Sequence, residues 1–190
     1  MNVMTAPDVW SGQDRALTVA DMENMPDDEF SYELDDGVLI VSPAPSNLHQ
    51  LAVLRLAQVL DAACPPGLVV LPGPGVNLSQ YQHRVPDVAV VRAESMDTVF
   101  QERPPALAVE VASPRTRLYD RNRKKDVHEQ FGIVSYWIVD PDRDKPELIV
   151  FELREGRYQE VARVAGDEVY RAGLPFPVTV TPSALVRISR

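Results

Sequence analysis

Residues 106–112, ALAVEVA, combine the small and β-branched apolar residues of a buried strand with a glutamate, Glu110, near their centre. An unpaired carboxylate inside a buried strand is costly, so a fold that contains this strand must supply a partner for it. The residues that share the face of Glu110 are all alanines, which leave space beside the carboxylate. The strand is therefore expected to carry both part of the core and part of a polar site.

The segments around this strand predict an α/β (α+β) fold, with a mixed β-sheet flanked by helices. Leu56 and Leu60 belong to an apolar face with helical spacing, which predicts a helix over about 48–63. A basic helix over about 117–131 is expected to end at Gly132, a favourable residue for a helix C-terminus. Strands are expected at 68–71 (with a possible continuation to 79), 85–91, 106–112 and 134–140.

Two hairpins are expected as additions to this core. The N-terminal hairpin covers about 30–42, where Asp36-Gly37 supplies the positive φ angles of a tight turn. The C-terminal hairpin turns near Glu155-Gly156. Short helices are expected at 18–25 and 182–187.

Length and cysteine content bound the class of protein. The 190 residues suit one domain, expected over 17–190 after a disordered tail at 1–16. The single cysteine, Cys64, cannot form an internal disulfide, which agrees with a cytoplasmic location. The N-terminus has no signal-peptide pattern, and the longest apolar segment is interrupted by Arg55, so no membrane association is expected.

The net charge of -9 argues against a nucleic-acid partner only if it is evenly spread. Residues 1–40 hold ten acidic residues against Arg15 alone, so they carry the whole excess, and the rest of the chain is neutral. Residues 113–125 hold six cations against Asp120, a local charge of +5. Such a run could attract a polyanion, although on charge alone a solvated helix face explains it more simply.

Several common catalytic patterns are absent. The sequence has neither of the glycine-rich phosphate-binding motifs, GxGxxG and GxxxxGK[ST], and no GxSxG nucleophile motif. Its three histidines and one cysteine lack the spacing of a zinc site. The carboxylates therefore become the main candidates for chemistry.

Asp87 follows Pro86 at the start of one expected strand, and Glu110 lies within another. Either carboxylate alone would more simply be an ordinary ion-paired residue. Two that converge on one space would form an oxygen site suited to Mg²⁺ or Mn²⁺. Lys124 shares a helical face with Val127 and Phe131, so it should point toward the sheet and these acids.

The same helical geometry separates the neighbouring lysine from the site. Lys125 is about 100° further round the helix, and it is expected on the polar side with Arg121 and His128.

Four segments in this order resemble the Uma-type restriction endonuclease family: YELDDGVLIVSPAPSNLHQ, VPDVAVV, VEVASPRTRLYD and GIVSYWIVDP. The family belongs to the PD-(D/E)xK restriction-endonuclease-like superfamily, and the similarity covers about 17–186. The resemblance implies a restriction-endonuclease-like core and a metal-dependent endonuclease that hydrolyses phosphodiester bonds of nucleic acid, DNA rather than RNA. A homodimer would suit an enzyme that cuts two strands.

The resemblance also implies roles for individual residues. Pro86-Asp87 matches the PD element and Glu110 the (D/E), which makes both carboxylates metal ligands. Alanine occupies the usual lysine position two residues after Glu110, and Lys124 matches the lysine that the Uma-type family carries on the next helix. Glu33 matches an acidic residue that supports the metal site, and His49 matches a recurrent histidine of less defined role.

Some of these roles have simpler alternatives. Lys124 could merely neutralise the acids, and His49 could be a core histidine bonded to the hairpin. His128 stands where the family often has tyrosine, and a surface position is expected for it. Arg115, Arg117 and Arg121 are expected to contact phosphates, which predicts an affinity that falls with salt.

Two other classes of function remain open. A non-catalytic domain that binds nucleic acid or a protein partner would use the basic residues without Asp87 or Glu110. A different hydrolase could use two carboxylates as acid and base and would stay active in EDTA.

Overall fold

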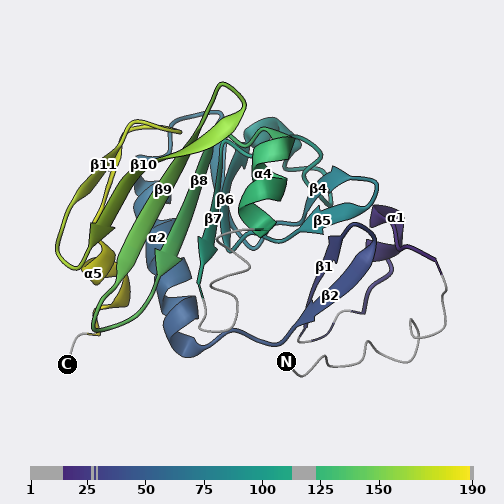
Figure 1. The fold of residues 1–190 in the computed structure, drawn as a ribbon, viewed down its shortest axis with the longest axis horizontal. Helices are drawn as coiled ribbons and strands as arrows, with labels where there is room; N and C mark the ends of the chain where they lie inside the picture. The colour runs from purple at the N-terminus through teal and green to yellow at the C-terminus, as the bar shows by residue number, and fades with distance from the viewer. Residues whose placement is uncertain (1–14, 27, 29, 113–122, 189–190) are drawn as a thin grey trace.

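Six strands form the main sheet of the computed structural model, which describes residues 15–26, 28, 30–112 and 123–188. The strand order is β10-β9-β8-β7-β6-β3 (Figure 1). The β7–β8 pair is parallel and the other pairs of this sheet are antiparallel, so the sheet is mixed, as expected. The strands are β3 (Leu68–Pro72), β6 (Val88–Arg92), β7 (Leu107–Val111), β8 (Ser135–Asp140), β9 (Glu147–Arg154) and β10 (Arg157–Ala165).

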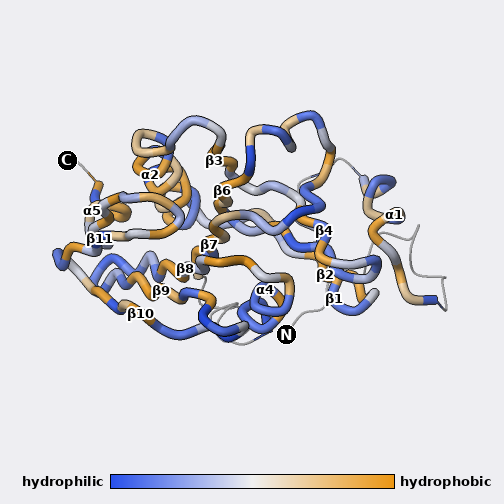
Figure 2. The backbone as a smooth tube through the Cα atoms, turned by 90° about the horizontal axis from the view of Figure 1, so that it is seen from above, coloured by the Kyte–Doolittle hydropathy of each residue, from blue (hydrophilic) through white to orange (hydrophobic). Residues whose placement is uncertain are grey.

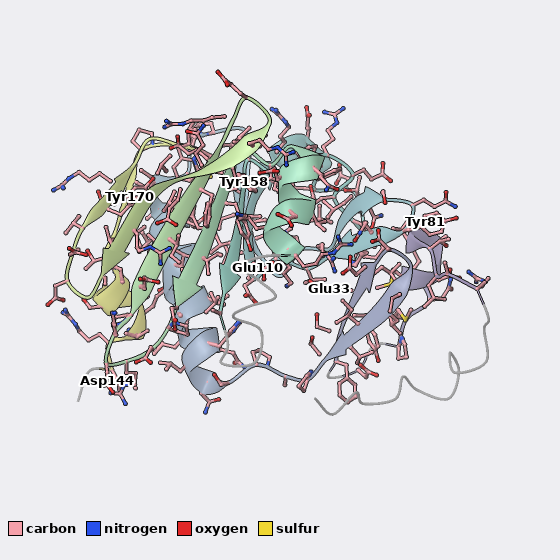
Figure 3. All side chains as sticks on the ribbon, in the orientation of Figure 1. Glu33, Tyr81, Glu110, Asp144, Tyr158 and Tyr170 are labelled. Carbon is pink, nitrogen blue, oxygen red and sulfur yellow. The ribbon has the colours of Figure 1, made fainter. Side chains whose placement is uncertain are left out.

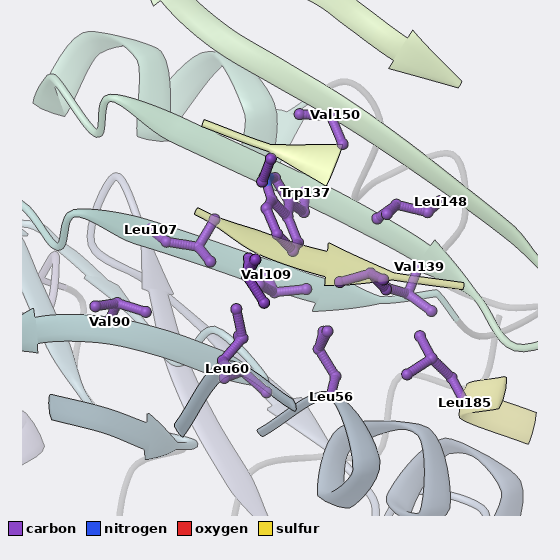
Figure 4. Close-up of a cluster of buried hydrophobic side chains, with 14 of the residues drawn as sticks. Leu56, Leu60, Val90, Leu107, Val109, Trp137, Val139, Leu148, Val150 and Leu185 are labelled. Atoms are coloured by element: carbon purple, nitrogen blue, oxygen red, sulfur yellow. The ribbon is translucent and has the colours of Figure 1, made fainter. Parts of the chain in front are cut away.

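Helices cover both faces of the main sheet (Figures 1 and 2). On one face, α2 (Asn47–Ala63) and α5 (Pro182–Val186) contribute to the larger core, where Leu56 and Leu60 of α2 meet Val109 and Trp137 (Figure 4). On the other face, α4 (Lys125–Phe131) lies over a smaller cluster that includes Tyr136 and Ile138. A parallel strand pair needs a crossover connection, and the segment that contains α4 provides it between β7 and β8.

Alternation along β7 decides which face Glu110 occupies. Val109 and Val111 belong to the core beneath α2, whereas Ala108 and Ala112 belong to the cluster on the α4 side. Successive side chains of a strand point to opposite faces, so Glu110 points to the α4 side.

A four-stranded sheet of order β2-β1-β5-β4 lies beside the main sheet, beyond α4 (Figures 1 and 2). Its first hairpin turns at Asp36 and Gly37, whose φ angles are 51° and 79°, as the Asp-Gly pair predicts. The last strand of this sheet in the sequence, β5, leads within three residues to β6, and Asp87 lies in that connection. The strands are β1 (Ser31–Asp35), β2 (Val38–Ser42), β4 (Val76–Ser79) and β5 (Gln82–Arg84).

The remaining elements are short. α1 (Val19–Met22) precedes the hairpin, and η1 (Ala93–Ser95) follows β6. β11 (Tyr170–Ala172) and β12 (Val178–Val180) form a separate two-stranded sheet. Within the described residues, no helix has the length and apolar character needed to cross a membrane.

Several expected boundaries were wrong. The first helix ends at Met22 and does not reach residue 25, and residues 68–79 form two strands in different sheets. Strands β5, β11 and β12 were not predicted, because three-residue strands show too little alternation to be recognised. The basic helix is α-helical only from Lys125, after a π-helical turn at residues 123 and 124, and residues 117–122 lie outside the described part of the chain.

Candidate active site

Asp87 and Glu110 come from neighbouring segments of the main sheet. The β6–β7 register pairs Val88 with Val109, and extending it by one residue places Asp87 opposite Glu110. Opposite residues of antiparallel strands point to the same face. The two carboxylates therefore lie on one side of the sheet, as the sequence predicted.

Asp87 is held by two donors from different elements. Its Oδ2 atom accepts a hydrogen bond of 2.7 Å from the Val111 backbone N–H and lies 3.2 Å from His49 Nε2. His49 is in the first turn of α2, where its backbone N–H donates to the side chain of the N-cap residue Ser46. The alternative contact of His49, with the hairpin, is not the one observed: its ring contacts Asp87.

The charge state of His49 follows from this contact. Partial burial disfavours the protonated ring, but the hydrogen bond and charge of Asp87, together with the charge of Glu110, raise the pKa of His49 above its ordinary value. His49 is thus a partner of the Asp87 carboxylate that contacts its Oδ2 atom and favours its position.

Lys124 connects Glu110 with the four-stranded sheet. Its Nζ atom lies 3.0 Å from Glu110 Oε2 and 3.2 Å from Glu33 Oε1. Glu33 in turn accepts a 3.0 Å hydrogen bond from the Val85 backbone N–H. Figure 3 shows Glu110 and Glu33 near each other, where the main sheet and the four-stranded sheet approach the base of α4. The predicted inward orientation of Lys124 and its approach to Glu110 are confirmed, but the second acid that it contacts is Glu33, where Asp87 was expected.

Burial dominates the electrostatics of Glu110, which is 2% exposed. Burial raises the pKa of the Glu110 carboxyl, Lys124 opposes that rise, and the charges of Asp87 and Glu33 add to it. For Glu33, Lys124 and Arg84 outweigh burial and lower the pKa of the carboxyl. Glu110 is therefore an acid whose ionised form is disfavoured, because burial outweighs the attraction of Lys124.

One oxygen of the Glu110 carboxyl, Oε1, is buried and has no hydrogen-bond partner among the described residues. No three His, Cys, Asp or Glu side chains in that part of the chain cluster closely enough to hold a metal alone. Mg²⁺, however, commonly binds through one or two carboxylates and retains several waters. Asp87 and Glu110 thus fit a hydrated Mg²⁺ or Mn²⁺, and they do not fit a site made of protein ligands only.

His128 is not on the surface, and the expectation that it would be was wrong. Its side chain is fully buried, packs against Tyr136 with ring centroids 5.1 Å apart, and places Nε2 3.6 Å from Glu110 Oε1. The physical reason is the helical repeat: residue 128 is one turn beyond Lys124, so both face the sheet. Burial, followed by the charge of Lys124, lowers the pKa of His128 to about 3, which keeps the ring neutral.

Comparison with known proteins identifies the family. The family model described as "Uma2: Putative restriction endonuclease" matches residues 19–184. The chain belongs to the Uma2 family. No curated protein matches the sequence.

Among solved structures, this Uma2-family chain is similar to the crystal structure of "a putative nuclease belonging to DUF820 from Anabaena variabilis ATCC 29413". The TM-score is 0.66, with 16% sequence identity over 84% of this chain and 89% of that one. At that identity the match establishes a shared fold, and the expected fold class is confirmed.

A cluster of charged residues beside the site was not anticipated from the sequence of this Uma2-family chain. Arg84 is fully buried, and its Nη2 atom lies 2.8 Å from Asp35 Oδ1. Arg123 donates from Nε and Nη2 to the same carboxylate, at 3.1 and 2.7 Å. Arg123, the residue before Lys124, is therefore held against the four-stranded sheet. This contact positions the backbone from which the Lys124 side chain extends.

The predicted phosphate contacts lie outside the described residues; they are Arg115, Arg117 and Arg121. A hollow of about 460 Å³ lies at the other end of α2, between Ala63 and Pro177, and none of the candidate site residues that the structure describes lines it. Its position argues against a role in the chemistry of the two carboxylates and the lysine.

Proposed function

We propose that this Uma2-family chain is a metal-dependent endonuclease that hydrolyses phosphodiester bonds of DNA. The observation that carries the proposal is the inward Lys124, whose amine lies 3.0 Å from a buried carboxylate on the same face as Asp87. Two acids and one amine from separate elements, gathered on one face of a sheet, have the chemistry needed to bind a divalent ion and an anionic phosphate together. Family membership supports a nuclease function in general terms.

Asp87 and Glu110 would hold Mg²⁺ or Mn²⁺, together with the carbonyl of Val111. When bound, the ion would supply Lewis-acid chemistry: it lowers the pKa of a bound water and polarises a phosphodiester oxygen. Lys124 would place its positive charge where negative charge develops on phosphorus.

The other residues would act on these three groups. His49 would hold Asp87 in its orientation through the 3.2 Å contact with Oδ2. Glu33, 3.2 Å from the Lys124 amine, would keep that amine at the site after a metal ion competes with it for Glu110. Arg115, Arg117 and Arg121 would bind flanking phosphates.

One observation favours a second candidate function. Lys124 already pairs with both Glu110 and Glu33, an arrangement that also serves simple charge neutralisation. A domain that binds nucleic acid through its basic residues without cleaving it would show the same contacts. In that case, binding would not depend on Asp87 or on a metal ion.

The two functions are separated by incubating supercoiled plasmid DNA with the wild type and with Asp87→Asn, each in Mg²⁺ and in EDTA. We expect the wild type to nick or linearise the plasmid in Mg²⁺ only, and Asp87→Asn to be inactive in both. DNA binding by both proteins without any cleavage would favour the binding domain. Cleavage that persists in EDTA would rule out metal dependence.

A further inference from the structure

His128 is a buried polar side chain whose hydrogen bonds are not satisfied. It is fully buried, and neither ring nitrogen has a hydrogen-bond partner among the described residues. Leaving a buried donor or acceptor unpaired destabilises the folded state. Such a group calls for a function or for a partner that a small movement would supply.

The nearest candidate partner is also unsatisfied. Glu110 Oε1 lies 3.6 Å from His128 Nε2, and it too has no hydrogen-bond partner within the described residues. A neutral imidazole carries one N–H, so a single bond between these atoms would satisfy both. The terminal torsion of a glutamate is broad, and a small rotation of the carboxylate would bring the oxygen into range.

Helix geometry explains why both oxygens of Glu110 face the same helix. Lys124 and His128 are four residues apart, so their side chains lie one above the other on the face directed at the sheet. Lys124 contacts Oε2, and His128 lies next to Oε1. Tyr136 packs against the imidazole from the sheet side and restricts its orientation.

We infer that His128 is a positioning residue for Glu110, which it holds through a hydrogen bond from Nε2 to Oε1. This bond fixes one oxygen of the carboxylate and leaves the other for Lys124 or a divalent ion. The expected effect on metal binding rests on the proposed function, in which Glu110 is a metal ligand. His128 would then hold that ligand in place without touching the metal ion. Loss of such a partner typically weakens metal affinity about 10- to 100-fold.

Two variants of His128 test the consequence. His128→Phe keeps an aromatic ring against Tyr136 but removes the donor, whereas His128→Gln keeps a donor near the position of Nε2. Isothermal titration of Mn²⁺ should show about 10- to 100-fold weaker binding for His128→Phe and near-normal binding for His128→Gln. Equal affinities of the wild type and His128→Phe would overturn the inference and leave the proposed function intact.

A matched control is His83→Phe. His83 is also buried, but its Nδ1 atom lies 2.7 Å from Asn77 Oδ1, and its ring packs against Phe100. The same substitution there should leave Mn²⁺ affinity unchanged. A similar loss in both variants would show a general effect of losing a buried histidine and would contradict a specific role for His128.

A second readout needs neither a metal ion nor a His128 variant that folds. In protein labelled with ¹⁵N-histidine, ring nitrogen shifts report which nitrogen carries the proton. We expect the Nε2–H form of His128, with a ring N–H signal that moves in Glu110→Gln. The Nδ1–H form would overturn the inference. If the wild type binds no Mn²⁺, the proposed metal site fails, and this spectrum still decides whether His128 holds Glu110.

Discussion

Replacing Lys124 with alanine is expected to slow Mg²⁺-dependent DNA cleavage by about two to three orders of magnitude, the loss typical of removing one group that stabilises transition-state charge. The amine lies 3.0 Å from Glu110, on the face that carries both candidate metal ligands, and its positive charge cannot be replaced by water alone. Single-turnover cleavage measures the loss. Mn²⁺ affinity should be retained, because no metal ligand has been removed.

Lys125→Ala is the matched control, because the same side chain is removed one residue further along. The Lys125 amine lies 5.1 Å from the centre of the Phe151 ring, and no ion pair places it on Glu110 in the described part of the chain. We expect near-normal cleavage and at most weaker DNA binding. Equal loss of cleavage in the two variants would mean that the inward orientation of Lys124 has no catalytic importance.

Replacing Arg84 with methionine is expected to lower the free energy of unfolding by about 3–5 kcal/mol, because a buried charge pair is broken while its acids remain. Arg84 is fully buried, 2.8 Å from Asp35 and 3.9 Å from Glu33. Methionine fills much of the same volume but leaves both carboxylates with less compensation. Urea unfolding at pH 7 measures the difference.

The surface variant Arg157→Met controls for the loss of an arginine as such. Arg157 also pairs with a carboxylate, that of Glu129, but its side chain is 83% exposed, and such pairs contribute little. Its unfolding free energy should change by less than about 1 kcal/mol. An equal change of unfolding free energy in Arg84→Met and Arg157→Met would contradict the claim that burial makes the Arg84 ion pairs important.

The pH dependence of the Arg84 effect has a definite sign. The pKa values of Glu33 and Asp35 are held below their ordinary values, with Arg84 among the causes that outweigh burial. Carboxyls with lowered pKa values stabilise the fold above their unfolded-state pKa, near 4, and this stabilisation is lost as the pH falls. The loss of unfolding free energy caused by Arg84→Met should therefore be complete at pH 7 and should become smaller below about pH 4.

The inward face of α4 shows what periodicity could and could not predict. The spacing of Lys124, Val127 and Phe131 was enough to direct the lysine at the sheet, and the contact with Glu110 confirms it. The same repeat places residue 128 on that face, one turn beyond Lys124, although a surface position was expected for His128. His128 is buried beside Glu110 and Tyr136, so the helical repeat determined where its side chain lies.

The contacts that complete the site are long-range, and no local pattern encodes them. Arg123 binds Asp35 across 88 residues, and His49 meets Asp87 across 38. Each depends on how the four-stranded sheet and α2 pack against the main sheet. From the sequence alone, alternation placed Glu110 in a strand and helical spacing directed Lys124 at the sheet, because both are local signals. Asp87 was expected at the start of a strand over 85–91, but it lies in the connection just before β6. The contacts of His49 and Arg123 depend on packing between distant elements, so no local pattern predicted them.

Titration of Mn²⁺ into metal-free wild type, Asp87→Ala and Glu110→Gln tests most directly whether these two acids form a metal site. The wild type should bind Mn²⁺, and each variant should bind more than about 100-fold more weakly, because losing a ligand exceeds the loss of an outer partner. Binding of equal strength in all three proteins, or no binding by the wild type, would contradict the proposed site.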